Sequence, residues 1–168
     1  IAFHAERDKR KDAVVAVLKK IQVAQDVYRM VTGKYAANFD SLSSVLNNGK
    51  IEVAKLEADP TDPTNQDKFV KTVSYTPAKD SLFSILNQSI NVDSLRYIPF
   101  AGGKTFEIDA DTLTHQGSLV NVVKVGTKYK EFMGEFANPT YKKYDKFYDP
   151  EKMIQFGDMN SPNTNGNW

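Results

Sequence analysis

Residues 14–34, VVAVLKKIQVAQDVYRMVTGK, decide the fold because they predict a long amphipathic helix. Apolar side chains recur at spacings of three and four, which is the period of one helical face. Gly33 follows this pattern where a helix end favours a left-handed residue. The members of the apolar stripe are Val14, Val17, Leu18, Ile21, Ala24, Tyr28 and Val31. We expect this stripe to form the spine of the core.

The stretch just before the stripe is fully charged, with the seven residues ERDKRKD at 6–12. Arg7 and Arg10 continue the geometric face of the stripe, so only the second half of a helix over 4–32 has an apolar face. We therefore expect residues 1–13 to form a charged helical stalk that projects from the domain. Such charges also mark the boundary of a bilayer, where insertion stops, and this predicts a transmembrane segment upstream. A frayed, solvated helical turn is the alternative.

The overall composition fits one globular domain, with 168 residues, 40% hydrophobic and 26% charged. The 22 basic and 21 acidic residues leave a net charge of +1, which favours neither nucleic acid nor anionic lipid as a partner. The chain has no cysteine, so disulfides, thiol catalysis and thiolate metal sites are excluded. We expect a single globular domain over 14–160 and a polar tail over 161–168.

The rest of the chain predicts short elements of both kinds. A helix over 40–48, capped by Asn38 or Asp40, and another over 129–136 follow from helical spacing. The stretch 80–90 is ambiguous between helix and loop, and 58–67 is a loop. Alternation predicts strands at 69–77 and 104–109, β-branched residues predict one at 118–125, and further short strands are expected at 95–100 and 153–156. The sum is an α+β fold, in which a long N-terminal helix packs on a small antiparallel sheet with short peripheral helices.

The segment GKYAANFDSLSSVLNNGK (33–50) follows the long helix with a Gly-x-Tyr step, a loop and a second helix. Over residues 5–46 this arrangement resembles type IV pilins and type II secretion pseudopilins. Gly33, Tyr35 and Leu42 match their pattern, while Ala36 stands where those families usually have proline. The resemblance implies a pilin-like fold, an N-terminal membrane anchor and a structural or interaction role.

Three further stretches are similar to a group of uncharacterised, membrane-anchored envelope proteins of Gram-negative anaerobes. They are LRYIPFAGGKTFEIDADTL (95–113), VNVVKVGTKYKEFMG (120–134) and FGDMNSPNTNGNW (156–168). This resemblance implies a cell-envelope location, with the soluble domain periplasmic or extracellular. It implies no chemistry, because the group has no assigned activity.

Two groups of aspartates are candidate metal ligands. Asp59, Asp62 and Asp67 share one loop, and Asp109 and Asp111 alternate onto one face at a strand end. Carboxylate oxygens suit Ca²⁺, but the spacing matches no EF-hand loop. Solvated turns explain both groups without a metal. We expect no bound metal and no cofactor.

The only neutral-pH bases are His4 and His115, and no nucleophile motif lies near either. We therefore expect no enzymatic activity.

The segment TYKKYDKFYDPEK (140–152) mixes aromatic side chains with lysines. The spacing of Tyr141, Tyr144 and Tyr148 favours core packing, with Lys142, Lys143 and Lys146 covering the outside. A sugar-stacking surface is the alternative binding interpretation, and a base-stacking, phosphate-binding patch is a third. Trp168 is expected to be loosely ordered.

The sequence thus predicts a non-catalytic, membrane-tethered envelope protein with protein partners or self-assembly and without nucleic acid. An envelope module that binds a ligand such as a glycan through exposed tyrosines is the alternative.

Overall fold

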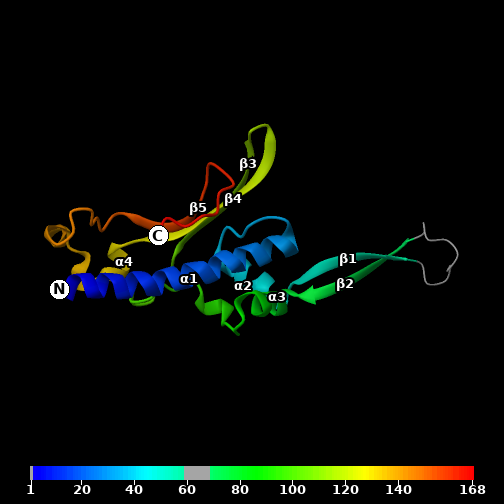
Figure 1. Ribbon diagram of the computed structural model, residues 1–168, viewed down its shortest axis with the longest axis horizontal. Helices are drawn as coiled ribbons and strands as arrows, with labels where there is room; N and C mark the ends of the chain where they lie inside the picture. Colours follow the sequence, from blue (N-terminus) through cyan, green and yellow to red (C-terminus); the bar gives the residue numbers. More distant parts are fainter. Residues whose placement is uncertain (1, 59–68) are drawn as a thin grey trace.

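The computed structural model describes residues 2–58 and 69–168 and shows the predicted α+β architecture (Figure 1). The long helix α1 (Ala2–Thr32) runs through the molecule, with a three-stranded sheet on one side and short helices around it. Within these described ranges there are two sheets in place of one, because the first two strands pair with each other and not with the other three. The strands are β1 (Lys50–Ala58), β2 (Phe69–Pro77), β3 (Glu107–His115), β4 (Ser118–Lys128) and β5 (Met153–Asp158). The helices after α1 are α2 (Phe39–Asn48), α3 (Ala78–Leu86), η1 (Val92–Ser94), α4 (Lys130–Met133), η2 (Gly134–Ala137) and η3 (Pro139–Lys143).

The predicted stripe of α1 is the spine of the core. Its members Val14, Leu18, Ile21 and Ala24 are fully buried, and Tyr28 is nearly so. The helix ends at Gly33, whose φ of 86° is left-handed and whose N–H donates to the carbonyl of Arg29 at 2.8 Å. The long amphipathic helix is therefore confirmed together with its buried face.

The expected projecting stalk is wrong for the residues that the structure describes. Phe3 is buried, and Arg7 and Arg10 lie against the segment 129–148. The Arg7 guanidinium donates to Asp145 at 2.5 Å, and that of Arg10 donates to the carbonyl of Phe132 at 2.9 Å. Charge did not signal exposure here, because an arginine can pack its stem and bond its head to a partner far along the chain.

The three-stranded sheet has the order β3-β4-β5 and is antiparallel throughout. A two-residue turn joins β3 to β4, and both of its residues, Gln116 and Gly117, have the positive φ that such hairpins require. The strand predicted at 118–125 is confirmed and extends to Lys128, whereas only the second half of the strand predicted at 104–109 lies in β3, which begins at Glu107. The strand predicted at 153–156 is also confirmed, as the edge strand β5.

The tail over 161–168 is docked and not loose. The backbone of Gly166 bridges to Phe156, and the N–H of Asn167 donates to the carbonyl of Gln155 at 3.0 Å. Trp168 is half-buried and packs against the core, so the expectation of a loosely ordered tryptophan is wrong. The polar tail stays in place because its backbone and asparagine amides satisfy hydrogen-bonding groups along the β5 edge.

The short helices and strands agree with the sequence predictions in some places and differ in others. The helix predicted over 40–48 is α2, and its cap is Asn38, whose side chain accepts from the N–H of Ser41 at 2.7 Å. The ambiguous stretch 80–90 lies largely in α3. The strand predicted at 95–100 is wrong: the segment makes one isolated bridge, between Tyr97 and Thr105. Pro99 provides no N–H for a longer ladder, and Phe100 has a φ of 64°.

The helix predicted over 129–136 is split into α4 and η2 at Gly134, whose φ is 57°. A separate turn, η3, then begins at Pro139. The aromatic side chains of this region still face the core, so the split changes the backbone more than the packing.

Candidate functional site

The hairpin of β1 and β2 forms an arm that extends away from the rest of the molecule (Figure 1). Its register runs without interruption from Lys50 opposite Pro77 to Ala58 opposite Phe69. Each of the two strands has the other as its sole strand partner among residues 2–58 and 69–168. We call this hairpin the arm.

One face of the arm carries four exposed apolar side chains, next to the charged side chains of Lys50, Glu52 and Lys71. Residues opposite each other in an antiparallel pair share a face, and every second residue along a strand lies on the same face. By this rule Leu56, Phe69, Val73 and Tyr75 share one face, and their exposed fractions are 70%, 62%, 39% and 63%. We call these four residues the arm apolar face.

This exposure is unusual for such side chains. A two-stranded hairpin is marginally stable in water by itself, and three or more strands or a packed face are needed to hold it. Exposed apolar patches on soluble proteins mark contact sites with other macromolecules or membranes. The arm apolar face is therefore the strongest candidate for a functional surface in the part of the chain that the structure describes.

The segment 140–152, which we call the tyrosine segment, packs in contrast mainly against the core. Tyr148 is buried, and its hydroxyl donates to the carbonyl of Phe136 at 2.7 Å. Burial, with a smaller contribution from the Asp149 carboxylate, raises the pKa of Tyr148 to about 12. Tyr141 is half-buried and stacks on Phe3, with ring centroids 5.2 Å apart.

Of the three candidate binding tyrosines, only Tyr144 is exposed, at 40%. The interpretation that these tyrosines pack against the core is confirmed for Tyr141 and Tyr148. The alternative, in which three exposed tyrosines form a binding platform, is wrong for the same two residues. The rings of both residues contact Phe3 of α1.

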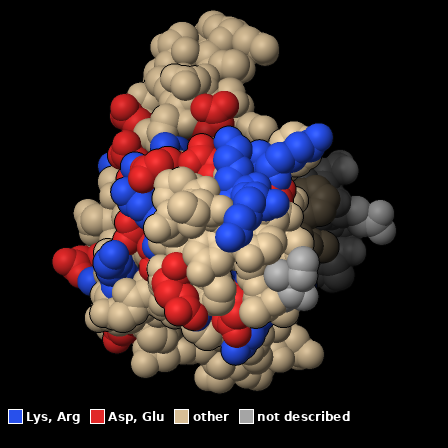
Figure 2. Space-filling view, turned by 90° about the vertical axis from the view of Figure 1, so that its left-hand side faces the viewer, with Lys and Arg blue, Asp and Glu red and all other residues tan. Residues whose placement is uncertain are grey.

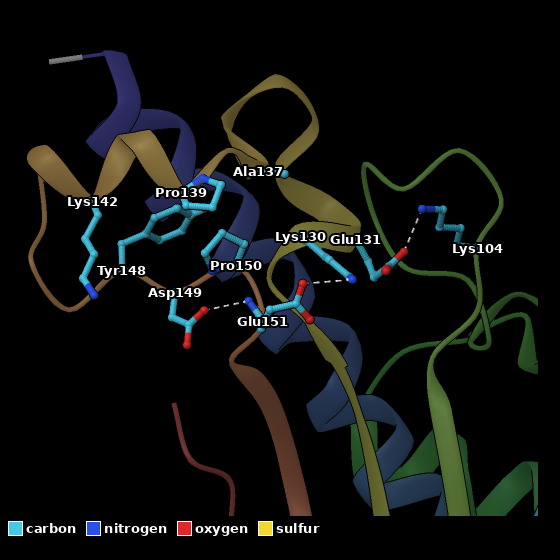
Figure 3. A pocket seen from close by; sticks show the side chains of 10 residues that line it. All are labelled: Lys104, Lys130, Glu131, Ala137, Pro139, Lys142, Tyr148, Asp149, Pro150 and Glu151. Carbon is cyan, nitrogen blue, oxygen red and sulfur yellow. Dashed lines mark hydrogen bonds and ion pairs between the residues drawn. The ribbon is translucent and has the colours of Figure 1, made fainter.

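A surface pocket of about 600 Å³ lies beside this segment (Figure 3). Its rim carries two ion pairs, one between Lys130 and Glu151 at 3.0 Å and the other between Lys104 and Glu131 at 2.7 Å. Hydrogen bonds from Lys128 and Lys130 hold the pKa of the Glu151 carboxyl below its usual range. These charges neutralise one another, so the arrangement stabilises the rim and offers no acid–base pair poised for catalysis.

Only two of the five candidate metal ligands, Asp109 and Asp111, lie in the part of the chain that the structure describes. Asp59, Asp62 and Asp67 lie outside the described residues. Asp109 and Asp111 are exposed on β3, and each accepts from the N–H of the residue that follows it. The described residues contain no group of three or more side chains that could hold a metal ion.

The two histidines lie on different elements, one at the start of α1 and the other at the end of β3, and these two places are far apart in Figure 1. His4 is near the start of α1 and its Nε2 lies 2.9 Å from the carbonyl oxygen of Tyr144. His115 ends β3 opposite Ser118, next to the turn at the tip of the hairpin. The two histidines therefore do not form a common site. The contact of His4 with the Tyr144 carbonyl connects α1 to the tyrosine segment.

Charges of both signs are interspersed on the end of the molecule that Figure 2 shows, and neither sign covers it alone. Such a surface provides no continuous basic track for a phosphate backbone. In residues 2–58 and 69–168 no helix combines the length and the apolar character needed to cross a bilayer.

Comparisons of the chain with protein-family models, with curated proteins and with solved structures gave no match.

Proposed function

We propose that this chain is the soluble domain of a membrane-tethered protein of the bacterial cell envelope, with a structural or interaction role and no catalytic one. The arm carries this proposal, because the described residues leave the side chains of the arm apolar face exposed. The domain folds around α1 and the sheet β3-β4-β5, and the arm extends from this body as a contact element (Figure 1). A pilin-like arrangement of a long helix against an antiparallel sheet is in keeping with such a role.

The tether is the second part of the proposal. The sequence similarity of residues 5–46 to pilins implies a membrane segment that leads directly into α1. We expect one apolar stretch of about 20 residues immediately upstream of Ile1 in the complete gene product. Reading the complete gene gives the answer, and an upstream sequence without such a stretch would remove the tether from the proposal.

The role of the arm can be tested by removing it without disturbing the body. Glu52 and Tyr75 lie opposite each other, so a two-residue Asn-Gly turn can join them and replace 53–74. The full-length protein is solubilised from its membranes, and the size of its complexes is measured by sedimentation. We expect the intact protein to sediment as a larger particle than the shortened variant.

The control for this experiment is the free energy of unfolding of the body. It should change by less than about 1 kcal/mol on shortening, because residues 53–58 and 69–74, the described part of what is removed, are exposed and contribute little to the core. A shortened protein that stays folded and still forms particles of the original size would contradict the proposal.

A ligand-binding role remains the second candidate, favoured by one observation. Phe147 is 78% exposed and lies at a pocket of about 280 Å³, whose other side chains include Arg7 and Asp145. An exposed ring beside hydrogen-bonding groups is the arrangement that sugars stack on. Titration with soluble envelope glycans, using Phe147→Ala as the variant, tests it: binding that this substitution abolishes would support the ligand-binding role.

A further inference from the structure

We infer that β2 pairs in antiparallel orientation with β2 of a second copy of this chain, about a two-fold axis at Val73. The inference rests on the proposed function, since it names the partner of the arm. It is carried by the different chemistry of the two arm edges and by the self-complementary pattern of β2.

The two edges of the arm differ in charge. β1 carries four charged residues among nine, while β2 carries one, Lys71. Charged side chains, lysine above all, protect an edge strand from pairing with another chain. The other residues of β2 are mostly β-branched or aromatic, the types that favour strand pairing. The charged residues of β1 are Lys50, Glu52, Lys55 and Glu57. The edge open to a further strand is therefore that of β2.

The side chains of β2 match their own copies when the axis passes through Val73. This register aligns all nine residues of the strand, from Phe69 opposite Pro77 to Pro77 opposite Phe69. Lys71 then lies opposite Tyr75 of the second copy, an arrangement that favours a cation–π contact, and it occurs twice. In this register Lys71 does not face its own copy, so like charges are not set directly opposite each other.

The positions around the axis match as well. Thr72 lies opposite Ser74 of the second copy, and such hydroxyl pairs stabilise neighbouring strands. Val73 lies opposite its own copy, which makes a β-branched pair at the centre. Around the axis, β2 therefore pairs hydroxyl side chains with hydroxyl side chains and a β-branched side chain with its own copy.

Pairing would also supply what the isolated hairpin lacks. The two arms together form a four-stranded sheet of order β1-β2-β2-β1, which exceeds the three strands needed for independent stability. It brings the two arm apolar faces together on one side of that sheet, so that Phe69 and Tyr75 gain neighbours from the second copy. A copy of the same chain thus completes the arm.

The first test uses the absence of cysteine from the chain. Val73→Cys places a single thiol at the proposed axis, and Val53→Cys places one at the centre of β1, where the exposed fraction is 44% against 39% for Val73. Under mild oxidation we expect Val73→Cys to form a disulfide-linked dimer at least tenfold faster than Val53→Cys. Equal rates at the two positions, or no dimer at either, would overturn the inference.

The second test measures self-association without a covalent link. Val73→Lys sets two like charges opposite each other at the axis, while Val53→Lys adds the same charge to β1. Sedimentation equilibrium of the 168-residue chain should show a dimer that Val73→Lys weakens at least tenfold and Val53→Lys leaves unchanged.

A wild-type chain that is monomeric at every concentration, or a dimer that Val53→Lys weakens as much as Val73→Lys, would overturn the inference. If the monomeric result came with complexes in the membrane extract that shrink when the arm is removed, the partner would be a different protein. The proposed function would then stand while the second copy is excluded.

Discussion

Phe3→Ala removes the side chain that holds the start of α1 to the body. The Phe3 ring is 1% exposed. It stacks on Tyr141 at 5.2 Å between centroids with 7° between the planes, and it meets Tyr148 edge-on at 5.0 Å. These contacts join the second residue of the helix to a segment more than 130 residues later in the chain.

The loss follows from the burial of the ring. Truncating a buried phenylalanine to alanine lowers the free energy of unfolding by about 3–5 kcal/mol. The first turn of a helix can move to close part of the resulting cavity, so we expect the lower end, about 3 kcal/mol. The stacking with Tyr141 contributes within this figure and is not added to it, because the truncation measures all contacts of the ring together.

Urea unfolding followed by circular dichroism measures the loss. Phe147→Ala is the matched control, since it removes the same ring from the same region at a position that is 78% exposed. The control should change the free energy of unfolding by no more than about 0.5 kcal/mol. If Phe3→Ala lowered the free energy of unfolding no more than its control does, the start of α1 would not be packed on the body. The prediction of a projecting stalk would then be correct.

Three further changes probe other contacts of the body. Arg10→Ala should lower the free energy of unfolding by about 1–3 kcal/mol in urea, because it leaves the carbonyl of Phe132 without its charged donor; an unchanged midpoint would contradict that contact. Gln25→Met should lower it by about 2–4 kcal/mol, since the buried Gln25 amide bonds both the N–H and the carbonyl of Ala36; a loss below about 0.5 kcal/mol would show that the loop is not held there. In an alkaline titration followed by ultraviolet absorbance, one phenol should ionise last, with a midpoint at about 12, and Tyr148→Phe should remove that step. The raised pKa of Tyr148 implies a contribution to the free energy of unfolding that is complete below pH 10, the ordinary tyrosine pKa, and is lost as the pH rises through 12. A free energy of unfolding that stays constant across this range would contradict the burial of Tyr148.

The periodic parts of the chain were predictable from sequence, because their pattern indicates both the type of secondary structure and the face of it that is buried. The stripe from Val14 to Tyr28 repeats at the helical period over four turns, and the structure buries that stripe. The cap at Asn38, the β-branched residues of β4 and the short apolar run of β5 were predictable for a related reason, since each rests on local sequence.

The contacts of Arg7 and Arg10 could not be predicted, because their partners lie 138 and 122 residues away in the chain. A local pattern contains no information about a partner at that distance, so the charges were interpreted as solvated. The buried amide of Gln25 was missed for a related reason: it satisfies the backbone of Ala36 in a loop, and nothing in its own helix indicates this.

The arm shows a different limit. Alternation predicted the strand at 69–77, and the same signal in KIEVAKLEA could have predicted β1. An alternating pattern shows that one face of a strand is apolar, but it does not show which neighbour covers that face. Whether Tyr75 is buried or exposed depends on the rest of the fold, and its exposure became visible only in the structure.

The central claim is that the arm touches another protein chain, and photo-crosslinking in cells tests it most directly. A photoreactive phenylalanine analogue replaces Tyr75 on the arm, which is 63% exposed, or Phe147 on the body, an aromatic control that is 78% exposed, in the complete gene product in its native cells. We expect ultraviolet light to join the Tyr75 variant covalently to a protein, whether a second copy or another chain, and to leave the Phe147 variant unlinked. An unlinked Tyr75 variant, or equal linking at both positions, would contradict the claim.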